Sequence, residues 1–135
     1  MITSDTICAQ ATAQGGAISI IRVSGQNAIE ITSRIFSKDI TKAKGYTLHY
    51  GHITDPQQEG ANIIDDVLVS VFRSPHSYTG EDSTEISCHG SRFIVQKILE
   101  ALIFSGARLA TPGEFTKRAF IAGKMDLSQA EAVAD

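Results

Sequence analysis

Three carboxylates lie within five residues of this sequence, at Glu81, Asp82 and Glu85, directly after the turn residues Thr79 and Gly80. In a surface loop such a cluster is simply solvated, with Gly80 at a positive-φ turn. Glu85 differs from the other two because it falls inside a predicted strand, which fixes the direction of its side chain. A partly buried carboxylate there needs donors, which a cation or the paired N–H edge of an aminopyrimidinone ring can provide.

Two cations could take part in the same chemistry. Arg22 lies in an apolar strand pattern, where a guanidinium is either a rim residue with its stem on the sheet or a clamp for a ligand carboxylate. Lys124 follows the helix stop at Gly123, a position where a solvent-facing cation favours the helix dipole. From the residues alone, both interpretations stay open for each cation.

Nucleotide hydrolysis has no signature in these residues. A phosphate-binding loop needs an upstream glycine and a Gly-Lys pair followed by Ser or Thr, but Gly123 and Lys124 precede Met125 and lack that glycine. The glycines near Gly15 and Gly25 do not form the G-x-G-x-x-G pattern of a dinucleotide site either. We therefore predict neither site in this sequence.

Metal binding and nucleophilic catalysis are equally unsupported. Cys88 and His89 are neighbours whose side chains should point to opposite faces of a strand, and the sequence has no C-x-x-C pattern. Cys8 lies among apolar residues, where a thiol is usually an inert core group. We predict no metal site and assign no catalytic residue.

The composition describes an ordinary soluble, globular domain. Of 135 residues, 42% are hydrophobic and 20% are charged, which excludes a disordered chain, and no apolar run reaches the length of a membrane span. The 12 basic and 15 acidic side chains leave a net charge of -3, so no general attraction for phosphate backbones is expected. Two cysteines make no disulfide framework, and the N-terminus has no signal-like stretch, so we expect a cytoplasmic protein.

Several segments have strand patterns that must position these side chains. Tyr46, Leu48 and Tyr50 alternate with polar residues, as in a half-buried strand. Residues 63–72 put Val67, Val69 and Val71 on one face and should lie centrally in the sheet. Residues 84–88 place Glu85 and Ser87 on the face opposite Thr84, Ile86 and Cys88. Further strands are predicted at 6–11, 18–23 and 107–110, and a surface loop at 73–83.

Helices are predicted at four places. The first runs from about residue 26 to 36 with Ser24 as its N-cap, and the second follows Ser91 and stops at Gly106. A Thr111–Glu114 capping box with Pro112 at the first helical position opens the third, which continues to Ala122. Asp126–Gln129 opens a fourth helix with no C-cap before the last residue. Because strands and helices do not alternate regularly, we expect an α+β fold with a mixed or antiparallel sheet and packed helices.

Three blocks of this sequence carry a family resemblance. They are DTICAQAT with GGAISIIRVSG at 5–25, SYTGEDSTEISCHG at 77–90 and TPGEFTKRAFIAGKMDLSQAEAVAD at 111–135. Together they resemble the N-terminal domain of the MnmE (TrmE) family of tRNA modification GTPases, in the family's order. The resemblance implies a fold similar to the folate-binding domain of aminomethyltransferases.

The resemblance also implies a function. Members act with the flavoprotein MnmG on the wobble uridine of tRNA, and their N-terminal domain forms a homodimer and binds 5-formyltetrahydrofolate, a tetrahydrofolate derivative that carries a one-carbon unit. By motif, Arg22, Glu85 and Lys124 correspond to folate-contacting positions. GTP and metal ions are expected only in a separate GTPase domain, and no membrane contact is expected.

Under this interpretation, residues 1–122 form the folate-binding and dimerisation domain, and 123–135 begin a helical domain that is cut short. A chain without the GTPase domain is not expected to be catalytic alone. Two alternatives stay open. One is a purely structural dimerisation module in which Arg22 and Glu85 pair with each other, and the other is a free-standing folate-dependent enzyme of the aminomethyltransferase type.

Overall fold

The computed structural model describes residues 5–60 and 62–133. Within them the chain forms a mixed six-stranded sheet of order β3-β4-β5-β2-β1-β6, in which β6 runs parallel to β1 and all other neighbours are antiparallel. The expected α+β class with a mixed sheet is confirmed. The strands are β1 (Ile7–Gln10), β2 (Ile18–Ser24), β3 (Thr47–Thr54), β4 (Ile63–Phe72), β5 (Ser83–His89) and β6 (Arg108–Leu109), and the helices are α1 (Ala28–Ile35), α2 (Arg92–Phe104), α3 (Glu114–Ile121) and α4 (Leu127–Val133).

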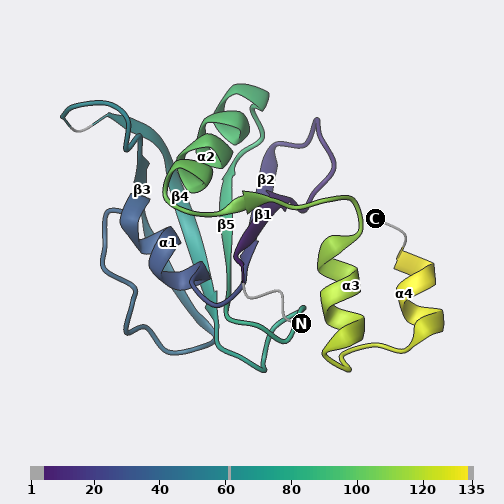
Figure 1. Cartoon of the computed structure of the whole chain (residues 1–135). Helices are drawn as coiled ribbons and strands as arrows, with labels where there is room; N and C mark the ends of the chain where they lie inside the picture. The colour runs from purple at the N-terminus through teal and green to yellow at the C-terminus, as the bar shows by residue number, and fades with distance from the viewer. Residues whose placement is uncertain (1–4, 61, 134–135) are drawn as a thin grey trace.

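One face of the sheet is covered by α1 and α2 (Figure 1). Alternate strand residues point into this layer, as the period of two requires. Val67, Val69 and Val71 of β4 share the buried side with Ile86 of β5, as their spacing predicted. The core therefore lies between the sheet and these two helices.

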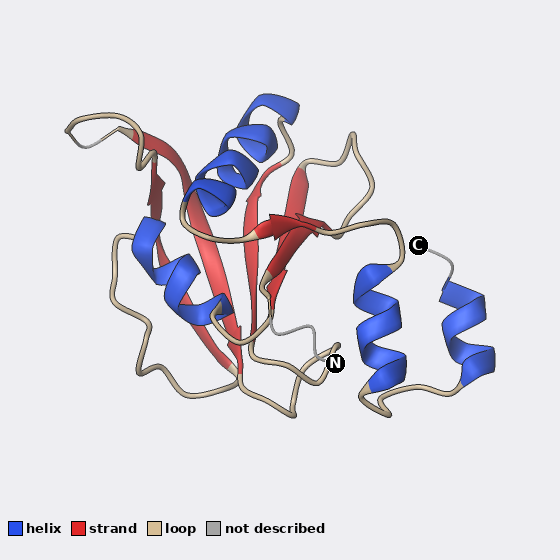
Figure 2. Ribbon diagram, viewed as in Figure 1, coloured by secondary structure: helices blue, strands red, loops and turns tan. Residues whose placement is uncertain are grey.

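The opposite face is covered only in part. The α3 helix stands beside β1 and β2, with α4 packed against it, away from the sheet (Figure 2). At the β3 side of this face, Leu48 and Tyr50 are each 61% exposed, and Leu68 of the neighbouring strand is 40% exposed. The β3 strand is half-buried as expected, but Tyr46, predicted to belong to it, precedes its first residue and has a positive φ. Leu48 and Tyr50 face outward, because Gly51 and Ile53 are the residues that point into the core.

Two local predictions about strand and helix positions were wrong. Ser24 does not cap α1, because it is the last residue of β2; the N-cap is Asn27, which makes no side-chain cap bond. The β4 strand has a neighbour on each side but lies one place from the edge, so β5 and β2 are the central strands.

The capping predictions for the last two helices had different outcomes. The α3 helix begins at Glu114, later than predicted, because Gly113 takes a left-handed conformation at the N-cap. Half of the capping box forms, since the Glu114 carboxylate accepts the Thr111 N–H at 2.9 Å. For α4 the box is complete, with Asp126 and Gln129 each accepting the other's backbone N–H at 2.8 Å. The predicted lack of a C-cap concerns residues 134–135, which lie outside the described residues.

Candidate functional site

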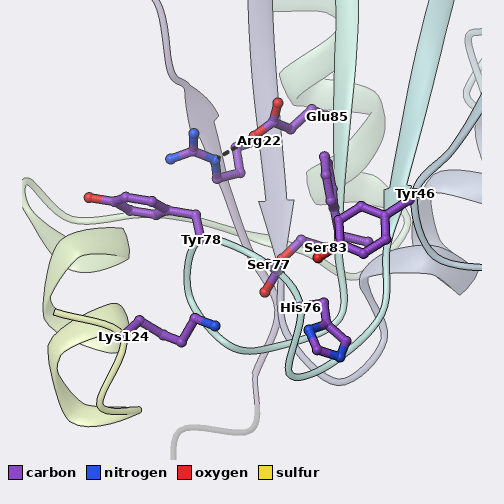
Figure 3. A pocket seen from close by; sticks show the side chains of 9 residues that line it. Arg22, Tyr46, His76, Ser77, Tyr78, Ser83, Glu85 and Lys124 are labelled. Carbon is purple, nitrogen blue, oxygen red and sulfur yellow. Dashed lines mark hydrogen bonds and ion pairs between the residues drawn. The ribbon is translucent and has the colours of Figure 1, made fainter.

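A cavity of about 340 Å³ opens on the partly covered face of the sheet, between β2, β4, β5 and the loops at their ends. Its volume is in the range of small-molecule sites. Figure 3 shows the side chains that line it. They are Arg22, Tyr46, Phe72, His76, Ser77, Tyr78, Ser83, Glu85 and Lys124, so the three residues singled out in the sequence all lie in one cavity.

Arg22 and Glu85 form an ion pair in the upper part of this cavity as seen in Figure 3. They are direct cross-strand partners in the β2–β5 register, and Arg22 Nε donates to Glu85 Oε2 at 3.1 Å. The two side chains are 19% and 25% exposed, so the pair is largely but not fully desolvated. Charge-assisted bonds of this kind fix both groups strongly in direction.

The guanidinium of Arg22 also lies close to two aromatic rings. Its Cζ atom lies 4.6 Å from the ring centre of Tyr78 and 5.5 Å from that of Phe115. Within the described residues, its only hydrogen bond uses Nε, so the other guanidinium N–H groups are available to a ligand. A second cavity of about 250 Å³, next to Thr111 and Gly113, also has Arg22 in its wall.

Lys124 approaches the cavity from the loop between α3 and α4. Its ammonium donates to the carbonyl of Pro75 at 3.1 Å and points toward the 74–80 loop (Figure 3). Gly80, at φ 83°, lets the two segments approach closely, because a Cβ there would lie 2.9 Å from Ala122 Cβ. Arg22 lies directly beside the Glu85 carboxylate, so Lys124 is the cation that stands apart from Glu85.

A buried hydroxyl network forms the support beneath the cavity. The Ser24 hydroxyl lies 2.6 Å from that of Thr79 and donates to Glu81 Oε1 at 2.8 Å, and the Ser83 hydroxyl donates to Ser24 at 3.1 Å. These three hydroxyl residues are at most 3% exposed. The side chain predicted to cap a helix therefore fixes the loop that carries Tyr78 and Glu81.

Glu81 leads from this network to Arg118, which ties α3 to the sheet. The Arg118 side chain is 5% exposed and contacts Glu81 at 3.2 Å, Asp5 at 2.7 Å and Glu114 at 3.4 Å. Arg108 binds the same two outer carboxylates, Asp5 and Glu114, at 2.7 Å each. The Arg108 hydrogen bond is the largest cause that lowers the pKa of Glu114 to about 2, and it also lowers that of Asp5.

Sequence reasoning missed this anchor and the aromatic lining of the cavity. Arg118 lies in a short amphipathic helix, where the sequence pattern predicts that an arginine faces solvent. Of its carboxylate partners, Glu114 is in the same helix, whereas Asp5 and Glu81 come from segments distant in the sequence. The signal that the sequence offers for Tyr78 is weak, namely a tyrosine beside glycine and acidic residues in the predicted loop. Its hydroxyl lies 3.0 Å from that of Thr116, which joins the loop to α3.

The remaining candidates behave as core or surface groups. Cys8 and Cys88 are buried free thiols, and burial raises their pKa values to about 12 and about 11. The described residues contain no cluster of three or more His, Cys, Asp or Glu side chains that could hold a metal ion. None of the helices in the same ranges is both long and apolar enough to cross a membrane.

The chain is thus an α+β domain whose partly covered sheet face carries an oriented carboxylate–guanidinium pair, aromatic rings and a distal lysine around a cavity of small-molecule size. The family described as GTP-binding protein TrmE N-terminus matches residues 6–124. The chain belongs to this family, and the resemblance seen in its sequence is confirmed.

Curated relatives give the same assignment. The chain is 61% identical to the tRNA modification GTPase MnmE of Bacteroides thetaiotaomicron and 60% identical to that of Bacteroides fragilis, in each case over 99% of its own length. It is 57% identical to the MnmE of Thermoanaerobacter pseudethanolicus over 97% of its length. The chain spans 29% of the length of each of these relatives, and it corresponds to their N-terminal domain.

Proposed function

We propose that this chain is the folate-binding and dimerising N-terminal domain of a tRNA modification GTPase that acts with MnmG on the wobble uridine of tRNA. The observation that carries the folate proposal is the cavity in which Glu85 and Arg22 pair while Lys124 stands apart. In this proposal GTP hydrolysis and its metal ion belong to another part of the full protein, and the location is cytoplasmic.

The charges in the cavity match the two ends of a folate such as 5-formyltetrahydrofolate. Arg22 occupies Oε2 of Glu85, so Oε1 and the remaining lone pairs can accept the N–H groups of an aminopyrimidinone ring. The free N–H groups of Arg22, at the same end, can donate to acceptor atoms of the ring, and the ammonium of Lys124, which stands apart, can pair with a carboxylate of the glutamate tail. Burial of both charges in a narrow site would orient the ligand.

In this proposal the domain binds and positions a one-carbon donor without supplying a nucleophile. Fixing the donor relative to a second reactant lowers the entropic part of the barrier, which needs no acid or base from this chain.

In the same proposal, residues 1–122 form the binding unit and residues 123–135 begin a helical domain. In support, α4 contains no buried residue within the described part of the chain. Lys124, from this second segment, nevertheless lines the cavity.

The same fold supports a homodimer through the uncovered sheet face. Leu48, Tyr50 and Leu68 are exposed there, and Tyr50 and Leu68 are direct cross-strand partners. A contiguous apolar area of this kind is typical of a protein interface. We also propose that the fold of this α+β domain is similar to that of the folate-binding domain of aminomethyltransferases.

A purely structural module is the alternative, because Arg22 and Glu85 do pair with each other. Calorimetric titration with 5-formyltetrahydrofolate separates the two. We expect the wild-type chain to bind and Glu85→Gln to bind about ten-fold to a hundred-fold more weakly, since a charge-assisted bond is lost. Glu100→Gln, on the far side of the sheet in α2, is the matched control. Absence of binding by the wild type would favour the structural module, and equal affinities for wild type and Glu85→Gln would show that Glu85 is not part of the binding site.

A further inference from the structure

Tyr46 is the single non-glycine residue with a positive φ among the described residues, at φ 60°. This left-handed region is uncommon for residues other than glycine, asparagine and aspartate, and a bulky residue there is a marked outlier. Its side chain is also 72% exposed, so the core gains nothing from the ring. Observed backbone outliers of this type concentrate at ligand sites.

The turn that holds Tyr46 is fixed from several directions. The Tyr46 N–H donates to the carbonyl of Val71 at 2.7 Å, which joins it to the end of β4. Arg73 donates to the carbonyls of Thr41 and Ala43 at 2.8 Å each, so the preceding loop is tied to the same strand end. The backbone of Gly45 passes so close that a Cβ there would lie 3.2 Å from Arg73 N. The surroundings therefore impose the left-handed conformation.

The Tyr46 ring is placed at the mouth of the cavity. It meets Phe72 edge-on with ring centres 6.2 Å apart, and it lies 6.1 Å from His76 at a tilt of 38°. In Figure 3, Tyr46 stands on one side of the cavity and Tyr78 on the other, with Glu85 above and between them. Two aromatic walls thus flank the opening below a carboxylate that has acceptor capacity left.

We propose that Tyr46 is a specificity-determining residue of this cavity, whose ring forms the wall on which a planar heteroaromatic ring of the ligand packs. The proposal rests on the folate-binding function proposed above, and it identifies Tyr46 as the aromatic wall of the cavity opposite Tyr78. Aromatic rings pack on planar rings at centre separations of about 4.5–7 Å, and the T-shaped contact with Phe72 keeps the Tyr46 ring oriented. Glu85 would then select the edge of the ligand ring, and Tyr46 its flat face.

The left-handed backbone makes the proposal unusually testable, because glycine and asparagine accept this conformation more readily than tyrosine. In calorimetric titrations with 5-formyltetrahydrofolate, we expect Tyr46→Gly and Tyr46→Asn to bind at least five-fold more weakly than wild type. We expect Tyr46→Phe to bind within two-fold of wild type, since the ring remains. The thermal unfolding temperatures of Tyr46→Gly and Tyr46→Asn should equal or exceed that of wild type. Phe93→Ser, which removes a ring that is 71% exposed on α2, is the control.

The possible results distinguish a ligand-binding role of Tyr46 from a role in a protein interface and from failure of the folate-binding function itself. If wild type binds the folate and Glu85→Gln does not, but Tyr46→Gly binds like wild type, then the ring is no part of the site and this proposal alone is overturned. If Tyr46→Gly weakens self-association in sedimentation and leaves the affinity per protomer unchanged, the ring belongs to a protein interface, and the proposal is again wrong. If the wild type does not bind, the proposed function fails and this inference with it.

Discussion

At the scale of single residues, the decisive contact is the one between Arg22 and Glu85. Each was recognisable in the sequence as a charged residue in a strand, but the contact depends on the β2–β5 register, which pairs residues 63 positions apart. Register follows from how both strands bury their faces together, so a single strand pattern does not contain it. For the same reason, the sequence left the pairing of Arg22 with Glu85 open as one alternative among others.

Residues whose environment is purely local were easier to predict. The side on which Val67, Val69 and Val71 lie follows from alternation, and so does the burial of Cys88 opposite Glu85. Tyr46 could not be predicted, because its φ of 60° is imposed by a strand end and by Arg73, which follow it by more than 20 residues. Conformations that the fold imposes against local preference have no sequence pattern of their own.

The two thiols give a residue-scale prediction. The pKa of Cys8 is raised to about 12 and that of Cys88 to about 11, in both cases mainly by burial. At pH 8 this lowers the reactive thiolate fraction by about a hundred-fold to a thousand-fold relative to an exposed thiol. We expect iodoacetamide to leave both cysteines unmodified in the folded chain over an hour, as measured by intact mass. Full modification in guanidinium chloride is the control, and rapid labelling of the native chain would show that one of the strands opens.

At the scale of elements, α3 shows where capping rules stop. The Thr111 and Glu114 spacing correctly indicated a helix start, yet the helix begins later because Gly113 takes a left-handed conformation, while Glu114 also binds Arg108 at 2.7 Å and Arg118 at 3.4 Å. The Asp126–Gln129 box, whose members have no such competitors within the described residues, formed as predicted. Local capping logic is therefore reliable when the side chains involved have no tertiary partners.

The position of α3 against β1 should depend on pH through Glu114. The pKa of this carboxyl is lowered from 4.5 to about 2, first by its Arg108 hydrogen bond. A lowered folded-state pKa gives stability that is present above pH 4.5 and is lost as the pH falls toward 2. We expect Glu114→Gln to lower the free energy of unfolding by about 2 kcal/mol at pH 6, after allowance for solvent screening.

Urea unfolding at pH 6, 4, 3 and 2.5 measures this effect. The difference between wild type and Glu114→Gln should shrink at the acidic end, because wild type then loses the same charge. Glu100→Gln, whose parent side chain is 48% exposed on α2, should show little difference at any of these values. A wild-type-to-Glu114→Gln difference that stays constant down to pH 2.5 would mean that the carboxylate stabilises α3 through packing and not through its charge.

At the scale of the whole molecule, the chain is a sheet with two unequal faces. The class was predictable, since irregularly mixed strands and helices exclude a regular parallel fold. Which face stays open was not predictable, because Leu48 and Tyr50 read as core residues by type. Their strand instead buries Gly51 and Ile53, which face the layer of α1 and α2. Leu48 and Tyr50 therefore lie on the sheet face that these two helices do not cover. That these apolar side chains face outward follows only from the arrangement of the whole six-stranded sheet and its helices.

This open face leads to the last prediction, which concerns self-association. Leu48 and Leu68 are 61% and 40% exposed on adjacent strands, on the side that no helix of the described residues covers at β3 and β4. If a second copy packs there, a charge introduced at the centre of the contact must be buried unpaired, which is strongly unfavourable. We expect the wild-type chain to form dimers at micromolar concentration in sedimentation equilibrium, and Leu68→Glu to raise the dissociation constant at least a hundred-fold.

The Leu68→Glu measurement also distinguishes a dimer that forms through the sheet face from one that forms through the sheet edge. The β3 strand is at the edge of the sheet, so two copies could instead pair edge to edge through backbone hydrogen bonds. A face contact is sensitive to Leu68→Glu on the inner neighbour β4, whereas edge pairing of β3 leaves that side chain outside the new contact. Phe93→Ser, on the opposite side of the sheet, should leave the dimer unchanged, and all three chains should keep the same unfolding temperature at monomeric dilution. Dimers of equal strength in wild type and Leu68→Glu would show that the open face is not the interface, and a wild type that stays monomeric at 100 micromolar would show that this domain does not associate through any surface by itself.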